Sequence, residues 1–303
     1  MPRREAERAA NRGCESVGGE PSPGEALADL FAGREPDNVP QAAAGLRQKQ
    51  RVREFYDTIN DGLNGSIFAR DAIFLNFGYL ADGHPRSSPI ELPERLANRN
   101  RVDLVLELIG ACDLAGCDVL DIGCGRGGTI YTLDRFFGAG EIWGLDLSPS
   151  AIAFCRHRIG NRHIHFVNGD SERLPFLGGF FDAVTNVESS CLYADIYAFY
   201  REVWRVLAPG GRFFYTDILP AAHLESYKDC LLGLGMTLER DQDITGNVLR
   251  SLDADAERHF EVHGRKIDQE VMAFFLAAPG SRPYRDLQER RLSYRIWQLR
   301  KDG

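Results

Sequence analysis

Residues 119–130 read VLDIGCGRGGTI, and this stretch decides the fold of the 303-residue chain. An apolar run leads into glycines spaced G-x-G-x-x-G, and a helical pattern follows them. The glycines of this motif are Gly123, Gly125 and Gly128. Such glycines allow a tight turn and let a ligand approach the backbone closely. Asp146 lies about 20 residues further on, at the end of the next predicted strand, where an acid that binds ribose is expected.

Strand and helix patterns alternate along the middle of the chain. The predicted strands are 118–122, 141–145, 164–168, 181–187 and 212–216, and the predicted helices between them extend to Leu133, over 148–160 and over 196–207. This alternation is typical of βαβ units, which build a parallel sheet with helices on both faces. The sequence therefore predicts an α/β, doubly wound fold.

The flanking regions differ in composition from this core. Residues 1–45 contain few large apolar side chains, so we expect a disordered extension. Residues 46–112 are rich in aromatic side chains and include a predicted helix over 94–111, so we expect a helical segment that leads to the core. The core then spans 113–303. Within it, 220–288 is predicted to be a mainly helical cap, and 293–301 alternates like an edge strand.

The glycine motif alone suits any ligand that contains an adenosine, a dinucleotide included. Asp121, two positions before the first glycine, separates the alternatives. A dinucleotide places its pyrophosphate on the helix N-terminus, and a carboxylate there repels such an anion. The same carboxylate suits the amino group and sulfonium of S-adenosylmethionine. Asp146 then accepts from both ribose hydroxyls, and Asp170 accepts from the adenine amino group beside the backbone at Ser171.

Five ordered stretches together resemble the class I S-adenosylmethionine-dependent methyltransferases. They are VLDIGCGRGG, WGLDLS, NGDSERLPF, FFDAVTN and VLAPGGRFFYTD, and they cover roughly 118–220. The resemblance implies a Rossmann-like sheet of seven strands, mostly parallel, whose last strand is antiparallel and comes from the C-terminus. It also implies that Tyr56 of FYDTIN and Tyr79 of LNFGYL lie over the cofactor as part of a lid. The alternative is that this segment is a hydrophobic helix packed on the sheet.

The predicted cofactor-binding residues follow from these motifs. They are Tyr56, Tyr79, Asp121, Gly123, Cys124, Gly125, Asp146, Leu147, Gly169, Asp170, Ser171, Asn186 and Val187. The stretch FLNFGYL and the tail LSYRIWQLRK narrow the resemblance to bacterial small-molecule methyltransferases, such as the phthiotriol/phenolphthiotriol dimycocerosate enzymes and polyketide O-methyltransferases. This subgroup implies methylation of a hydroxyl on a lipid- or polyketide-like product of secondary metabolism.

Residues 186–195, NVESSCLYAD, follow the fourth predicted strand, at the sheet edge where open α/β folds bind ligands. A neutral hydroxyl is a poor nucleophile, so Glu188 is predicted as its proton acceptor. The alternative is that Glu188 caps a loop or pairs with an arginine. Tyr193 is expected to line the acceptor pocket, and His259 is a second candidate base. Serine or cysteine nucleophiles are not expected, because no base is paired with them.

Composition excludes several classes of partner. The net charge is -8 and the pI about 5.5, which argues against nucleic acid and anionic membranes. No apolar run approaches the roughly 18 residues of a membrane span, and the N-terminus lacks a secretory h-region. The 7 cysteines form no CxxC pair, and no metal-binding spacing is apparent. We therefore expect a metal-free cytoplasmic enzyme that takes a small-molecule acceptor, with a homodimer as an open alternative.

Two other functions stay open on the sequence alone. The acceptor atom can be carbon or nitrogen instead of oxygen, with Glu188 as the base in either case. Alternatively, the fold binds S-adenosylmethionine without transferring its methyl group, since a fold does not fix a function.

Overall fold

The computed structural model describes residues 41–64, 72–83, 86–263 and 273–303, without the side chains of 41–42 and 257–263. Residues 1–40 of the predicted disordered extension lie outside this part of the chain. Helix α2 begins at Gln41 and ends at Asn64, so it starts a few residues before the boundary predicted at residue 46.

Seven strands form one sheet in the order β3-β2-β1-β4-β5-β7-β6. Their bounds are β1 Val119–Ile122, β2 Ile142–Asp146, β3 Ile164–Asn168, β4 Phe181–Val187, β5 Leu207–Pro220, β6 Met236–Asp243 and β7 Leu292–Lys301. Strands β1 to β5 pair in parallel, whereas β7 runs antiparallel to both β5 and β6. The predicted seven-stranded, mostly parallel sheet is therefore confirmed.

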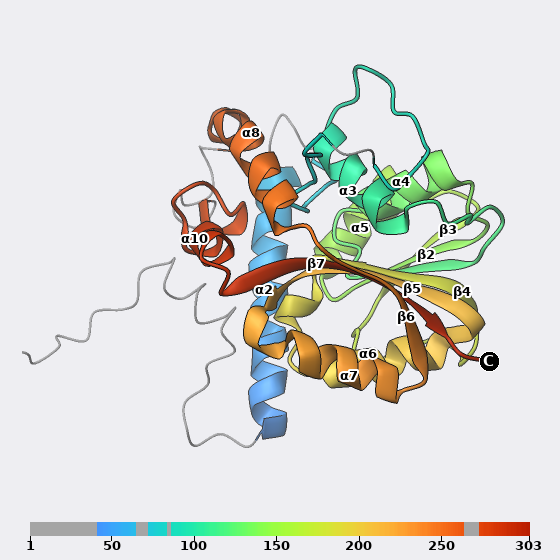
Figure 1. Ribbon diagram of the computed structural model, residues 1–303. Helices are drawn as coiled ribbons and strands as arrows, with labels where there is room; N and C mark the ends of the chain where they lie inside the picture. The colour runs from blue at the N-terminus through green and yellow to red at the C-terminus, as the bar shows by residue number, and fades with distance from the viewer. Residues whose placement is uncertain (1–40, 65–71, 84–85, 264–272) are drawn as a thin grey trace, which may run out of the picture.

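The C-terminal part of the sheet corrects two predictions. Strand β7 was expected at the edge, but it lies between β5 and β6, as Figure 1 shows. The edge strand is β6, which falls inside the region 220–288 that was predicted to be mainly helical. Alternate residues of its sequence, MTLERDQD, are exposed, because successive side chains point to opposite faces and one face of this strand is open to solvent. The sequence pattern of β6 is therefore too polar to be recognised as a strand.

Helices cover both faces of the sheet (Figure 1). Helices α3 (Arg99–Ile109), α4 (Gly128–Phe137) and α5 (Pro149–Arg158) lie on one face, and α6 (Ile196–Val206) and α7 (Leu224–Gly233) on the other. Helices α8 (Thr245–His263) and α10 (Arg282–Gln288) pack beside β7. Two short 3-10 helices, η1 (Ser190–Leu192) and η2 (Ala221–His223), complete the element order. Among the described helices, none is long and apolar enough to cross a bilayer.

The core is divided in two by the sheet, because successive side chains of a strand point to opposite faces. In β5, Phe214 packs on the α3 and α4 side, whereas Phe213 and Tyr215 pack on the α6 and α7 side. All three side chains are buried. A strand that is apolar on both faces belongs in a covered parallel sheet, so the strand ends are the main surface on which polar groups can gather.

Candidate active site

A cavity of about 410 Å³ lies where the parallel strands end. It falls within the range of about 300–1,000 Å³ that is typical of small-molecule sites. Most of the predicted site residues line it. These are Tyr56, Gly123, Cys124, Gly125, Asp146, Leu147, Gly169, Asp170, Ser171, Val187, Glu188 and Tyr193. Segments that follow β1, β2, β3 and β4 therefore converge on one space, as the motif order predicts.

The glycine loop between β1 and α4 is packed too tightly for side chains. Gly123 has φ of 71°, and a Cβ there would lie 2.2 Å from the Ser189 hydroxyl oxygen. At Gly128 a Cβ would lie 2.4 Å from a ring carbon of Phe74. The glycines thus serve two purposes. They shape the turn for a ligand, and they admit the loop after β4 and the segment before α3.

Asp146, at the end of β2, is oriented by two backbone N–H groups. Gly125 donates to Oδ2 and Ser148 donates to Oδ1, each at 2.8 Å. Burial raises the pKa of this carboxyl, and the two N–H groups oppose that shift. Each carboxylate oxygen keeps a further lone pair. Asp146 can therefore accept from vicinal hydroxyls, as a ribose requires, and the residues present fit an adenosine-containing ligand.

Asp170 is engaged by helix α2. Lys49 donates to its Oδ2 at 2.7 Å and also pairs with Glu172 at 2.6 Å. These ion pairs place a lysine beside the carboxylate that was predicted to accept from adenine. Lys49 was not predicted as a partner of Asp170, because the two residues lie 121 positions apart.

Helix α2 is fastened across this edge of the sheet at two further points. The Ser148 hydroxyl donates to Asp57 at 2.5 Å. Arg126, from the glycine loop, donates to the side-chain oxygens of Asn60 and Asn64 at 2.9 Å. Arg126 is 1% exposed, and burial lowers its pKa to about 10. Arg126 therefore joins the glycine loop to α2.

Tyr56 lines the cavity from α2, whereas Tyr79 does not. Among the described residues the Tyr56 hydroxyl has no hydrogen-bond partner, and burial raises its pKa well above the usual range. Tyr79 is 5% exposed and packs in the core on the α3 side. Its N–H donates to the Asn100 carbonyl, which holds the segment inward. The prediction that Tyr79 covers the cofactor is corrected on this ground.

Asp121 and Asn186 are both buried and lie outside the cavity lining. Asp121 accepts from the Thr185 hydroxyl at 2.7 Å, and burial raises its pKa to about 7. Asn186 donates to the Ile122 carbonyl, the Ser189 hydroxyl and the Tyr193 hydroxyl. In place of the predicted cofactor contact, the two side chains brace the ends of β1 and β4 beneath the glycine loop.

The loop after β4 is organised by Asp217, a residue that sequence reasoning missed. Its Oδ2 accepts from the N–H groups of Ser189, Ser190 and Cys191, and from the Ser190 hydroxyl at 2.6 Å. The carboxylate comes from β5, the neighbouring strand, and is buried. Burial and Asp217 raise the pKa of the Cys191 thiol well above its usual range. A cysteine nucleophile is disfavoured accordingly, and the two serines have structural partners.

Glu188 is held in an unusual conformation at the mouth of β4. Its φ is 49°, a left-handed value that costs a non-glycine residue about 1–2 kcal/mol. Oε1 accepts from the Phe77 N–H at 2.7 Å and from the Tyr294 hydroxyl. Burial raises the pKa of this carboxyl to about 8. The loop-capping alternative is thus present, since the Phe77 N–H belongs to a loop, and Arg101 lowers the pKa of the carboxyl. Glu188 also lines the cavity.

The other two predicted catalytic residues are Tyr193 and His259, and the structure describes the side chain of Tyr193 only. Tyr193 lines the cavity, and its hydroxyl lies 2.9 Å from the Ser189 hydroxyl. Burial raises the pKa of Tyr193 above its usual range, so it acts as a neutral hydrogen-bonding group. His259 belongs to α8, but its side chain lies outside the described residues and its role as a base stays a prediction.

The remaining wall of the cavity is mainly apolar. Phe77, Phe274 and Phe275 contribute rings, and Ile218 and Leu292 contribute aliphatic groups. Phe275 also contacts the Tyr56 ring edge to face, with centroids 6.0 Å apart. Within the described part of the chain, no group of three or more His, Cys, Asp or Glu side chains is placed to hold a metal ion.

Comparisons with known proteins agree with this geometry. A family model described as a methyltransferase domain matches residues 120–215. The fatty-acid O-methyltransferase of Mycolicibacterium smegmatis is 35% identical over 232 residues, which cover 75% of this chain and 82% of that protein. A phthiotriol/phenolphthiotriol dimycocerosates methyltransferase of Mycobacterium tuberculosis is 31% identical over 269 residues, with coverages of 86% and 96%.

A solved structure shows the same fold. It is the geranyl diphosphate C-methyltransferase of Streptomyces coelicolor A3(2), in complex with Mg²⁺, geranyl diphosphate and S-adenosyl-L-homocysteine. The TM-score is 0.60 at 16% identity, over 88% of this chain and 100% of that one. At this identity the likeness carries the architecture and leaves the substrate open.

Proposed function

This chain belongs to the class I S-adenosylmethionine-dependent methyltransferases, and we propose that it methylates a hydroxyl on a lipid- or polyketide-like small molecule. The observation that carries the proposal is the position of Glu188. One cavity contains the glycine loop and Asp146 on one side, and a carboxyl group set among aromatic side chains on the other. A hydroxyl acceptor with an apolar body suits that second side.

The cofactor half of the cavity binds and orients S-adenosylmethionine. Asp146 supports hydroxyls of the ribose, Gly123 and Gly125 supply close backbone, and Tyr56 lies over the site from α2. When bound, S-adenosylmethionine supplies an electrophilic methyl group. Holding the acceptor near attack distance and excluding water are the main tasks left to the protein, and such positioning is a large part of catalysis.

The acceptor half supplies the proton acceptor. A general base works best when its pKa lies near the operating pH, and burial has moved the pKa of Glu188 to about 8. In its ionised form Glu188 takes the hydroxyl proton as the oxygen is methylated, and then returns it to solvent. We propose that no metal takes part, since the carboxyl group of Glu188 itself meets the need for a base.

Support for an oxygen acceptor comes from the relative named as a fatty-acid O-methyltransferase. The relative named as a phthiotriol/phenolphthiotriol dimycocerosates methyltransferase supports a lipid-like acceptor. A carboxylic acid is already ionised at neutral pH and needs no base, whereas an alcohol or phenol does. The chemistry of the acceptor half, a mainly apolar wall with the Glu188 carboxyl of raised pKa, therefore favours the hydroxyl within this group of acceptors.

A labelled transfer assay tests the proposal. The protein is incubated with methyl-labelled S-adenosylmethionine and four probes: a long-chain diol, a phenol, a long-chain carboxylic acid and a long-chain amine. We expect label on the oxygen of the diol or the phenol, located by mass spectrometry. Label on carbon or nitrogen contradicts O-methylation. Binding of S-adenosylhomocysteine without transfer to any probe contradicts the enzymatic function.

A further inference from the structure

Tyr294 of β7 contacts Glu188, although Tyr294 does not itself line the cavity. Its side chain is fully buried, and its hydroxyl donates to Oε1 of Glu188. The Phe77 N–H donates to the same oxygen. Oε1 therefore accepts from two donors, which lie 106 and 111 residues away from Glu188 in the sequence.

The second oxygen of Glu188 is in a different situation. Among the described residues Oε2 has no hydrogen-bond partner, and it is not fully buried. Because Glu188 lines the cavity, Oε2 can be reached by a molecule bound there. Two donors on one oxygen leave the other free to face an acceptor, and they stop the carboxyl group from rotating between the two arrangements.

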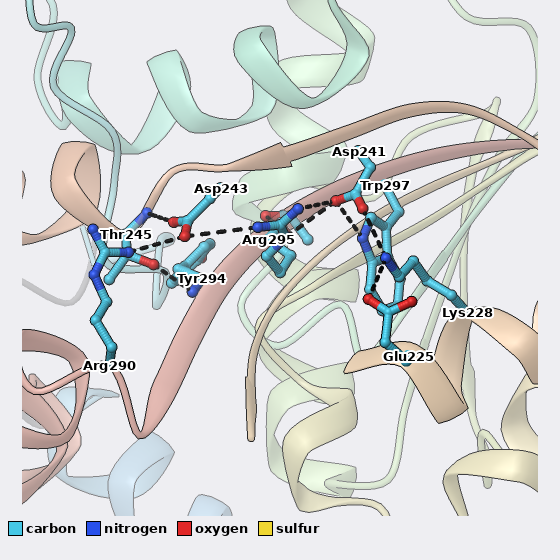
Figure 2. Close-up of polar contacts among 10 residues, drawn as sticks. Glu225, Lys228, Asp241, Asp243, Thr245, Arg290, Tyr294, Arg295 and Trp297 are labelled. Carbon is cyan, nitrogen blue, oxygen red and sulfur yellow. Dashed lines mark hydrogen bonds and ion pairs between the residues drawn. The ribbon is translucent and has the colours of Figure 1, made fainter. Parts of the chain in front are cut away.

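The backbone of Tyr294 is also held by hydrogen bonds. Its N–H donates to the Thr245 hydroxyl at 2.8 Å, and its carbonyl accepts from Ile244 at 2.9 Å. Thr245 is in turn held by Asp243, which also pairs with Arg290 at 2.9 Å. Figure 2 shows Asp243, Thr245, Tyr294 and Arg290 close together, with Arg295 between this group and Asp241. These contacts attach Tyr294 to the start of α8 and to Arg290, which follows α10.

We propose that Tyr294 is the positioning residue for Glu188, which holds Oε2 toward the acceptor and favours the ionised form of the carboxyl group. This inference rests on the proposed function, because it assigns Tyr294 to the same proton transfer. Tyr294 donates a hydrogen bond to Glu188, and a donor stabilises a carboxylate more than a carboxylic acid. Removal of the hydroxyl raises the pKa at which Glu188 ionises.

The charged and titratable groups around Glu188 allow this effect to be isolated. Asp217 of β5 raises the pKa of the carboxyl, and Arg101 of α3 lowers it. Tyr56 of α2 and Cys191 of η1 also face it, and burial raises the pKa of each well above its usual range. Both stay neutral while Glu188 titrates. A shift on loss of the Tyr294 hydroxyl is then attributable to that hydroxyl.

The first measurement does not need an acceptor. Protein labelled with ¹³C at the glutamate side-chain carboxyl is titrated by NMR in the presence of S-adenosylhomocysteine, and Glu188→Gln identifies the signal. We expect a midpoint near 8 in the wild type and about one pH unit higher in Tyr294→Phe, since one unit corresponds to a hydrogen bond of ordinary strength. Tyr284→Phe is the matched control, because its buried hydroxyl donates to Asp253 at 2.6 Å outside the cavity.

The second measurement uses turnover of whichever probe is methylated. Tyr294→Phe should lower kcat roughly 10-fold with little change in KM, and should move the acidic limb of the pH profile upward. In a Glu188→Gln background the same change should have no further effect, as a double-mutant cycle requires of a residue that acts through another. An equal loss in both backgrounds, or an unchanged NMR midpoint, overturns the inference.

Two further results keep these outcomes separate. If Tyr294→Phe fails to fold, 3-fluorotyrosine placed at position 294 serves instead, because its more acidic hydroxyl is a stronger donor and should lower the Glu188 midpoint. No change of midpoint then counts against the inference. If the wild type methylates no oxygen, the proposed function fails, whereas the NMR titration still decides whether Tyr294 controls Glu188.

Discussion

The two halves of the cavity are built in different ways. Apart from Tyr56 of α2, the cofactor half comes from short stretches that directly follow β1, β2 and β3, so these residues are close in sequence to the strand that presents them. The acceptor half is assembled from Phe77, Glu188, Phe275 and their supports, which lie far apart along the chain. The first half is a local motif, and the second is a product of tertiary packing.

This difference predicts a separation of effects. Changes in the cofactor half should weaken binding of S-adenosylhomocysteine, and changes in the acceptor half should slow turnover while leaving that binding intact. A variant that violates this separation shows that the two halves are coupled.

Gly123→Ala should have the largest effect on the cofactor half. An alanine Cβ would collide with the Ser189 side chain, and φ of 71° is unfavourable for any residue but glycine. We expect binding of S-adenosylhomocysteine to weaken roughly 100-fold, the equivalent of about 2.8 kcal/mol, because the loop must move away from Ser189 and its backbone moves with it. Calorimetry measures it. Gly138→Ala is the control, since its φ is 61° and nothing lies within 4 Å of its added Cβ; equal losses in both variants would remove the collision as the cause.

Asp146→Asn should have a smaller effect on the same half. The amide keeps the shape of the side chain but cannot accept two N–H groups and two hydroxyls as a carboxylate does. Hydrogen bonds to a charged group contribute about 1.5–3 kcal/mol, so we expect affinity to fall about 10- to 100-fold. Asp182→Asn is the control, because Asp182 accepts from the Asp118 N–H at 2.9 Å away from the cavity. Unchanged affinity in Asp146→Asn would show that this carboxylate does not hold the ribose.

Tyr56→Phe should have the smallest effect, and it sharpens the boundary between the halves. The Tyr56 hydroxyl has no protein partner among the described residues, so its loss leaves the free protein undisturbed. We expect binding of S-adenosylhomocysteine to weaken by about 3- to 10-fold, the equivalent of one neutral hydrogen bond. Tyr79→Phe, outside the cavity, should leave the dissociation constant unchanged. If Tyr56→Phe and the wild type have the same dissociation constant for S-adenosylhomocysteine, Tyr56 does not belong to the cofactor site.

The sequence predicted most of the cofactor half because each motif is contiguous with its strand. Strands β3 and β4 have the predicted bounds. Asp146, Asp170 and Glu188 lie at the carboxyl ends of β2, β3 and β4, at the edge of the sheet that lines the cavity. Ser148 caps α5 by accepting from the Ala151 N–H at 3.1 Å, as its position before Pro149 predicts.

The rest could not be predicted because it depends on contacts between distant segments. Lys49 meets Asp170, and Asp217 organises the loop after β4, but no local pattern marks either residue as a partner. The position of Tyr79 was predicted wrongly for a related reason. The sequence shows an aromatic segment, and only packing against α3 decides that Tyr56 faces the cavity while Tyr79 faces the core.

The central claim is that Glu188 accepts the proton of the hydroxyl that is methylated. Burial holds the pKa of its carboxyl at about 8, so Glu188 is mainly protonated at neutral pH and ionises as the pH rises. The most direct test is the pH dependence of kcat/KM for the wild type and Glu188→Gln, with the affinity for S-adenosylhomocysteine measured in parallel. The account predicts a wild-type rate that rises to a plateau above a midpoint near 8, and a variant about 100- to 10,000-fold slower with no such rise and with unchanged affinity. Wild-type turnover in Glu188→Gln would contradict it, and positioning alone would then explain the site.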